Sequence, residues 1–365
     1  MIAIAAVLLG GCVRYGSYPI TRTVGGETRR GVFVSPPQYE SFVRGELAFA
    51  QGDFRGAAEA YERARASGDD DALLCARLAD ARDRQGDRAG AEHALADGEA
   101  LDPRAEIVWR TRGEIAERHG ELEPAIAAYE RAHDAEPASE EPVLALARVL
   151  AQAGHDDRAA SLLTDYTAHA ETPLGAVRAA LALAIARGDA VRIADAATRL
   201  VHLAPGHVDE IEQAISALRA HGEVVIAQRL LAAVPPQTVD RELAIETAIA
   251  AHDRAEAERL LAFPEGDDAR TLVRDARHWL ALGDAARAAE LAEVARTRTD
   301  ASAEATLVLA DARLASGRTP DAAVLYASIA PGASVYDDAR EGLARALAAG
   351  GLPALGAEVA AHAAR

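Results

Sequence analysis

The chain has few residues whose types and spacing could support catalysis. Four histidines that could act as metal ligands or proton carriers recur along it, at His119, His155, His221 and His252. Each stands beside a regularly spaced glycine or in its place, where a solvated turn histidine is expected rather than a ligand. The sequence has no glycine-rich phosphate loop and no Gly-x-Ser-x-Gly, His-Glu-x-x-His or Cys-x-x-Cys motif. We therefore expect a non-catalytic protein that uses no metal or cofactor.

The two cysteines lie in different contexts. Cys75 falls within an apolar helical pattern at an inward-facing position, so we predict a small core residue rather than a nucleophile. Cys12 directly follows the apolar run of residues 1–11. Those eleven residues are too few to cross a bilayer as a helix, which takes about 20.

Residues 9–12, Leu-Gly-Gly-Cys, resemble a bacterial lipobox. The resemblance implies that residues 1–11 are a signal peptide and that Cys12 is acylated, for example with palmitate. An Asp after the cysteine often signals retention in the inner membrane, whereas this chain has Val13. The resemblance therefore implies an outer-membrane lipoprotein that faces the periplasm.

No basic residue precedes Cys12, which departs from the usual signal peptide. Either the true start lies upstream of Met1, or the N-terminal amine supplies the charge, or the apolar N-terminus is not processed at all. Residues 12–37 are rich in Gly, Pro, Ser and Thr and have no helical period, so we predict a flexible tether there.

A 34-residue period runs through the rest of the chain. The period is marked by turn glycines at Gly52, Gly86, Gly120, Gly154, Gly188 and Gly222, and again at Gly283, Gly317 and Gly351. The 61-residue spacing from Gly222 to Gly283 leaves room for one shortened repeat, with its turn at His252-Asp253. Only 4% of the residues are aromatic, and we find no strand-like alternation. The pattern predicts ten helical hairpins with cores of Ala, Leu and Val.

Residues 106–137 resemble one tetratricopeptide repeat. The resemblance rests on Trp109, Gly113, Gly120, Ala125, Tyr129, Ala132 and Pro137, with Arg112 and Ala116 departing from the usual Leu and Tyr. Large residues then face small ones across the hairpin, and each hairpin must stack on copies of itself. The resemblance implies an all-α solenoid, a right-handed superhelix over residues 38–365. We expect its units to start near residues 38, 72, 106, 140, 174, 208, 238, 269, 303 and 337.

Two groups of residues are candidates for binding a partner protein or peptide. The first is aromatic: Tyr39, Phe42 and Phe49 share one face of the first repeat. Aromatic anchors are enriched at binding hot spots, which favours a docking site. The alternative is that Phe33 and its neighbours fold back and cover this face as a cap.

The second group is polar and comprises Asp80, Arg84, Arg110 and Glu114, which we expect to point towards the groove of the solenoid. The alternative is that these residues only form solvated pairs within one helix, Asp80 with Arg84 and Glu114 with Arg118. Carboxylates also stand where the family's clamp for a peptide carboxylate would need Asn. We therefore expect no binding of that kind.

The net charge of −18 disfavours nucleic acid and anionic lipid head groups as partners. A lipid on Cys12 would then be the only membrane contact. These features favour a non-catalytic scaffold or assembly factor of the bacterial cell envelope that binds another protein. The alternative is a soluble cytoplasmic tetratricopeptide scaffold or regulator with an unprocessed N-terminus, and an enzyme ranks behind both. The sequence identifies neither the partner nor the pathway.

Overall fold

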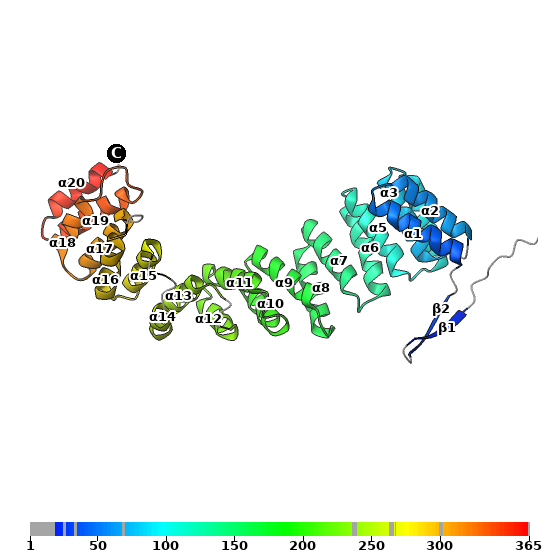
Figure 1. Ribbon diagram of the computed structural model, residues 1–365, viewed down its shortest axis with the longest axis horizontal. Coiled ribbons are helices and arrows are strands. Elements are labelled where there is room, and N and C mark those ends of the chain that lie inside the picture. The colour runs from blue at the N-terminus through cyan, green and yellow to red at the C-terminus, as the bar shows by residue number, and fades with distance from the viewer. Residues whose placement is uncertain are drawn as a thin grey trace, which may run out of the picture. The chain divides into compact units, whose positions relative to one another are not determined.

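The computed structural model describes residues 19–24, 27–32, 35–67, 70–235, 239–262, 266, 268–298 and 302–363. The chain divides into two compact units, Met1–Leu183 and Ala184–Arg365, and each is described by itself. The described residues form twenty α-helices and one two-stranded sheet (Figure 1). Cys12, the predicted lipidation site, and Phe33, which belongs to the predicted cap, lie outside the described residues.

The helices of the N-terminal unit follow one another as short antiparallel elements. They are α1 (Pro36–Ala50), α2 (Phe54–Ser67), α3 (Ala72–Arg84), α4 (Arg88–Leu101), α5 (Glu106–Arg118), α6 (Leu122–Ala135), α7 (Glu140–Gln152) and α8 (Asp156–His169). Helix α9 (Leu174–Arg187) runs from this unit into the next.

The C-terminal unit continues the series. Its helices are α10 (Ala190–Leu203), α11 (Val208–Ala220), α12 (Val224–Ala233), α13 (Arg241–Ala250), α14 (Arg254–Leu261), α15 (Ala269–Ala281), α16 (Ala285–Arg296), α17 (Ser302–Ala315), α18 (Thr319–Ala327), α19 (Tyr336–Ala349) and α20 (Pro353–Ala363). The twenty helices form ten pairs, each joined by a tight turn, as the 34-residue period predicts.

The turn explains the period. Gly120 has a φ of 73°, a left-handed conformation that L side chains rarely adopt. Its N–H bonds to Glu117 O at 2.9 Å and the next N–H, of Glu121, bonds to Ala116 O at 2.9 Å, which ends α5 and lets the chain reverse. The other predicted turn glycines also have φ between 66° and 90°. At the shortened repeat His252 takes the same place with a φ of 57°, so the turn predicted there is confirmed.

Close helix packing within a hairpin depends on large residues facing small ones. A Cβ added to Gly113 would lie 2.6 Å from Cε1 of Tyr129, so only glycine lets α5 and α6 approach this closely. Gly45 and Tyr61 make the same kind of contact between α1 and α2. Ala125 has no exposed surface, and the core clusters of this unit are mostly Ala, Leu, Val and Ile. The predicted packing is therefore confirmed at these positions.

The N-terminal segment departs from the prediction that the chain contains no strand. Strands β1 (Pro19–Val24) and β2 (Glu27–Val32) pair antiparallel within the range predicted as a tether. The Gly25-Gly26 pair between two runs with Thr and Val is a hairpin signal that the composition of the segment obscured. Helix α1 begins at Pro36, two residues before the predicted start. Ser35 caps it by accepting a hydrogen bond from Gln38 N at 3.2 Å.

Candidate protein-interaction site

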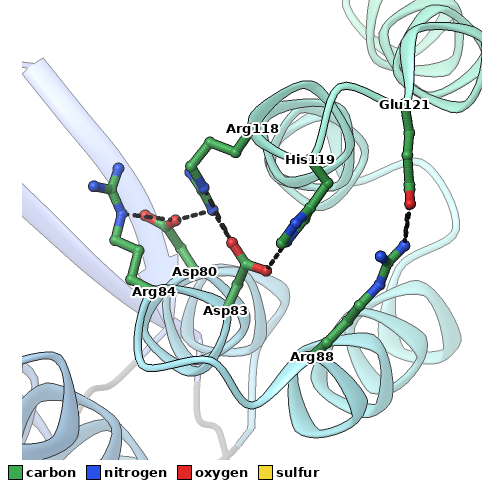
Figure 2. Close-up of polar contacts among 7 residues, drawn as sticks. All are labelled: Asp80, Asp83, Arg84, Arg88, Arg118, His119 and Glu121. Atoms are coloured by element: carbon green, nitrogen blue, oxygen red, sulfur yellow. Dashed lines mark hydrogen bonds and ion pairs between the residues drawn. The ribbon is translucent and has the colours of Figure 1, made fainter.

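Polar side chains join α3 to α5 at the ends of the two helices (Figure 2). Arg118 Nη2 donates to Asp80 Oδ1 at 2.7 Å and to Asp83 Oδ2 at 2.8 Å. His119 Nε2 lies 2.7 Å from Asp83 Oδ1. Because Asp80 and Asp83 are both buried, these contacts satisfy carboxylates that would otherwise be costly to bury.

The Asp83 carboxyl is held in its charged form. Burial raises its pKa, but the hydrogen bonds from His119 and Arg118 oppose this effect and hold the pKa below its usual range. Asp83 therefore stays ionised near neutral pH and links the second hairpin to the third.

Arg84 connects this network to the aromatic residues of the first hairpin. Its Nε donates to Asp80 Oδ1 at 3.1 Å, while its guanidinium carbon lies 5.1 Å from the ring centre of Phe49 and 5.6 Å from that of Phe54. The two rings pack edge to face with their centres 5.3 Å apart. We call Phe49, Phe54, Asp80 and Arg84 the arginine–aromatic cluster. It brings together three of the residues predicted from the sequence.

The terminal nitrogens of Arg84 point away from Asp80 in Figure 2. The Arg84 side chain is 38% exposed, and both phenylalanines are only partly buried. The cluster therefore presents guanidinium donors beside two aromatic rings at the surface.

A second link in the same view joins α4 to the turn before α6. Arg88 Nη2 donates to both carboxylate oxygens of Glu121, at 2.7 and 2.8 Å (Figure 2). Aspartates at the corresponding turn position cap their own helices, as Asp87 does by accepting from Gly90 N at 2.9 Å. The longer Glu121 side chain makes no such cap and instead reaches the neighbouring hairpin.

Arg110 and Glu114 belong to a separate contact between α5 and α7. Arg110 bonds to Glu106 at 2.8 Å, to Glu114 at 2.9 Å and to Glu141 at 3.2 Å, and only 18% of its side chain is exposed. Burial lowers the pKa of Arg110, but the three carboxylates outweigh this and raise it. The predicted pair of Glu114 with Arg118 is wrong, because Arg118 crosses to α3. The predicted pair of Asp80 with Arg84 is confirmed.

The three predicted aromatic residues have different surroundings. The Phe42 ring packs against that of Tyr61, with ring centres 6.1 Å apart. Phe42 and Phe49 both contact the core cluster of buried residues between Ala57 and Ile115. Tyr39 instead stands 62% exposed on α1, beside Val43 and Leu47.

Sequence reasoning missed Phe54 and the bonds between hairpins made by Asp83 and His119. The same kind of bond recurs along the first helices of the hairpins: Glu46 with Arg77, Glu117 with Arg148, Arg219 with Glu246 and Glu242 with Arg274. The partners lie 27 to 32 residues apart in these pairs, and Asp83 and Arg118 lie 35 apart. Opposite charges at nearly one repeat length were therefore a usable signal.

Cys75 is buried in the core, as the sequence predicts. Burial raises the pKa of Cys75 to about 12, so its thiol stays protonated and unreactive, as expected of a core residue. Within the described ranges no three His, Cys, Asp or Glu side chains gather as a metal site would require. None of the described helices is long and apolar enough to span a membrane.

The fold and this surface define an α-solenoid of tetratricopeptide-type hairpins. No family model matches the sequence, and no curated protein matches it. Solved structures with a similar fold include the C-terminal part of a TPR protein from Cytophaga hutchinsonii. It has a TM-score of 0.45 and 14% identity, over 73% of this chain and 99% of that one.

Two further solved structures are similar in fold to this chain. A thermophilic TPR protein from Thermus thermophilus has a TM-score of 0.36 and 22% identity, over 50% of this chain and 98% of that one. PilW, a type IV pilus biogenesis factor, has a TM-score of 0.34 and 16% identity, over 65% of this chain and 98% of that one.

Proposed function

We propose that the protein is a non-catalytic scaffold of the bacterial cell envelope that docks another protein on the arginine–aromatic cluster. The observation that carries this proposal is Arg84, which lies across two phenylalanine rings while 38% of its side chain is exposed. Arginine and aromatic residues dominate binding hot spots, because they combine a large contact area with directed hydrogen bonds. This combination supports a docking surface at the arginine–aromatic cluster.

The bonding of Arg84 defines the chemistry of its partner. Asp80 holds Nε, so the guanidinium is oriented before binding and loses little freedom when a ligand arrives. The remaining donors suit a carboxylate, and the rings beside them suit an apolar side chain. The partner segment therefore carries an acidic residue next to an apolar one.

The other predicted residues have supporting roles. Phe42 packs against Tyr61. Arg110 bonds to Glu114 within α5 and to Glu141 of α7, so Arg110 holds α5 against α7. Tyr39 lies on a different part of α1 and contributes nothing to this contact.

Docking is tested by capturing the partner from a detergent extract of bacterial envelopes with Arg84→Gln and Phe54→Ala variants. We expect both variants to lose the protein that the parent chain captures, with little change in circular dichroism for Arg84→Gln. Arg340→Gln is the matched control, because Arg340 lies 5.8 Å from the ring centre of Tyr336 in the C-terminal unit. Equal capture by Arg84→Gln and Arg340→Gln would refute this docking site.

We further propose that residues 1–11 are removed as a signal peptide and that acylation of Cys12 anchors the protein in the outer membrane, facing the periplasm. One acyl chain gives only marginal membrane binding, whereas two or three give stable anchoring. A flexible connection from Cys12 would then leave the solenoid free to reach its partner.

Labelling with radioactive palmitate tests the anchor. We expect label in the parent chain and in Cys75→Ala, and none in Cys12→Ala, which should also leave the membrane fraction. Label that persists in Cys12→Ala would contradict acylation at Cys12, and a parent chain without label would favour the cytoplasmic alternative.

A further inference from the structure

A cavity lies beside helix α8, in the N-terminal unit. Its volume is about 900 Å³, and its walls come from the end of α6, the start of α7, helix α8 and the connections on either side of α7 and α8. Ligand pockets in proteins occupy about 300–1,000 Å³, so this cavity has the size of a small-molecule site. None of the residues of the arginine–aromatic cluster lines it.

Tyr166 of α8 forms one wall of the cavity, at a place where the three preceding hairpins have small residues. The residues at the preceding multiples of 34 positions are Ala64, Gly98 and Ala132. A Cβ added to Gly98 would lie 2.9 Å from Cγ2 of Val108, so two hairpins approach closely at this place. Tyr166 is larger, and its hydroxyl donates to Ala138 O at 2.9 Å in the connection between α6 and α7. The fourth hairpin therefore has an aromatic ring in the cavity wall.

Three carboxylates also line the cavity, and no arginine is among the described residues that line it. Glu140 accepts a hydrogen bond from Ala176 N at 2.8 Å. Asp165 and Glu171 are exposed and form no ion pair with other described residues. A positively charged ligand suits this cavity, because it would pair with carboxylates that the protein leaves free.

A buried nitrogen is a second indication of a ligand. Nδ1 of His133 is shielded from solvent and has no hydrogen-bond partner among the described residues, and His133 lines the cavity. Leaving a buried polar atom without a partner is costly. In the tautomer that carries its proton on Nε2, Nδ1 is an acceptor, so an ammonium group of a ligand would satisfy it.

The arrangement of these side chains does not suit a metal ion. In the part of the chain that the structure describes, no three His, Cys, Asp or Glu side chains gather as a metal site requires. A ligand whose positive charge is spread over several groups fits better. Leu162, Pro137 and the ring of Tyr166 add apolar surface to the same cavity. An aromatic face also attracts ammonium groups through cation–π contact.

We propose that this cavity binds an alkylammonium ligand, in which amino groups are joined by hydrocarbon chains. Its ammonium groups pair with Asp165 and Glu171, and its hydrocarbon chain packs against Leu162 and the Tyr166 ring. Two sources have this chemistry, a free polyamine and the lysine side chains of a polypeptide. The inference goes beyond the proposed docking function and does not depend on it.

Isothermal titration calorimetry of the full chain in a non-ionic detergent tests the proposal. The probes are spermidine, as the free polyamine, and an acetylated peptide with several lysines. We expect saturable binding of at least one probe, and the tighter probe identifies the source. Asp165→Asn/Glu171→Gln should bind that probe at least about tenfold more weakly. Its melting temperature should match that of the parent chain, because both side chains are exposed.

Two changes at Tyr166 separate the ring from the hydroxyl. Tyr166→Leu removes the aromatic face and should bind the probe about threefold to thirtyfold more weakly. Tyr166→Phe keeps the ring and loses only the bond to Ala138 O, so its affinity should stay within about twofold of the parent value. Equal affinities for Tyr166→Leu and Tyr166→Phe would contradict the contact with the ring.

The matched control removes two exposed carboxylates of α19, as Asp337→Asn/Glu341→Gln. It changes the net charge by the same amount as Asp165→Asn/Glu171→Gln, so it measures the general attraction of a cation to a chain of charge −18. This control should bind the probe like the parent chain, and so should Arg84→Gln.

A parent chain that binds neither probe, or equal weakening in Asp165→Asn/Glu171→Gln and the α19 control, would overturn the cavity as a binding site. Neither result affects the capture experiment on Arg84 or the palmitate experiment, so the proposals fail separately.

Discussion

Replacing Asp275 by alanine should destabilise the C-terminal unit more than any change to a surface charge. Asp275 on α15 and Arg241 on α13 form a two-bonded ion pair, Nη1 to Oδ1 at 3.0 Å and Nη2 to Oδ2 at 3.1 Å. Their side chains are only 4% and 11% exposed, and Arg241 Nε also donates to Leu260 O at 3.2 Å. This pair fastens the shortened hairpin of α13 and α14 to the hairpin that follows.

The expected loss follows from burial. Removing one partner of a buried pair leaves the other charge without compensation, which costs about 3–5 kcal/mol. For a unit of this size each kcal/mol lowers the melting temperature by about 2–4 °C. Asp275→Ala should therefore lower the melting temperature of the C-terminal unit by roughly 6–20 °C.

Thermal unfolding followed by circular dichroism measures this loss, and amide exchange in α13 localises it. Asp321→Ala is the control, because Asp321 pairs with Arg318 at the surface and should contribute less than about 1 kcal/mol. The double variant Arg241→Met/Asp275→Leu removes both charges and should recover most of the stability. A melting temperature for Asp275→Ala equal to that of Asp321→Ala would refute the reasoning.

Three further predictions concern packing, the turn and pH. Ala125→Leu should lower the free energy of unfolding by about 1–3 kcal/mol, because Ala125 is fully buried between helices, and an unchanged denaturation midpoint would contradict this. His252→Gly should raise the free energy of unfolding by about 1 kcal/mol, because a left-handed φ strains histidine but not glycine, and urea titration checks the sign. The Asp83 pKa is lower in the folded chain, so its stabilising effect is present above the unfolded value of 3.8 and is lost as pH falls through the folded value. Asp83→Asn should lack this loss of stability in acid, and identical pH profiles for both proteins would count against the bonds from Arg118 and His119.

The hairpins were predictable because one backbone requirement recurs at a fixed interval. A chain that reverses direction between two helices within two or three residues needs one residue in the left-handed conformation. Glycine adopts that conformation at the lowest cost. The glycines at 34-residue spacing therefore located the turns, and His252 could be recognised by its position alone. Gly113 opposite Tyr129 could be predicted for a different reason, because close packing of two helices restricts residue size.

The polar contacts were less predictable because they depend on how neighbouring hairpins stack. Four-residue spacing offered both Asp80 and Glu114 a partner within their own helix, yet Arg118 reaches α3 instead. Spacing along one helix cannot rank these choices, since the distance across to the next helix decides between them. Phe54 was missed as a site residue because its role depends on Arg84, which comes from the next hairpin.

Photocrosslinking in living cells tests the central claim most directly. A photoreactive amino acid would replace Phe54 in the arginine–aromatic cluster or, as a control, Val225, an exposed residue of α12. We predict one defined crosslinked protein from position 54, none from position 225, and loss of the product when Arg84→Gln is added. The same products from both positions, or a position-54 product that survives Arg84→Gln, would contradict docking at this cluster.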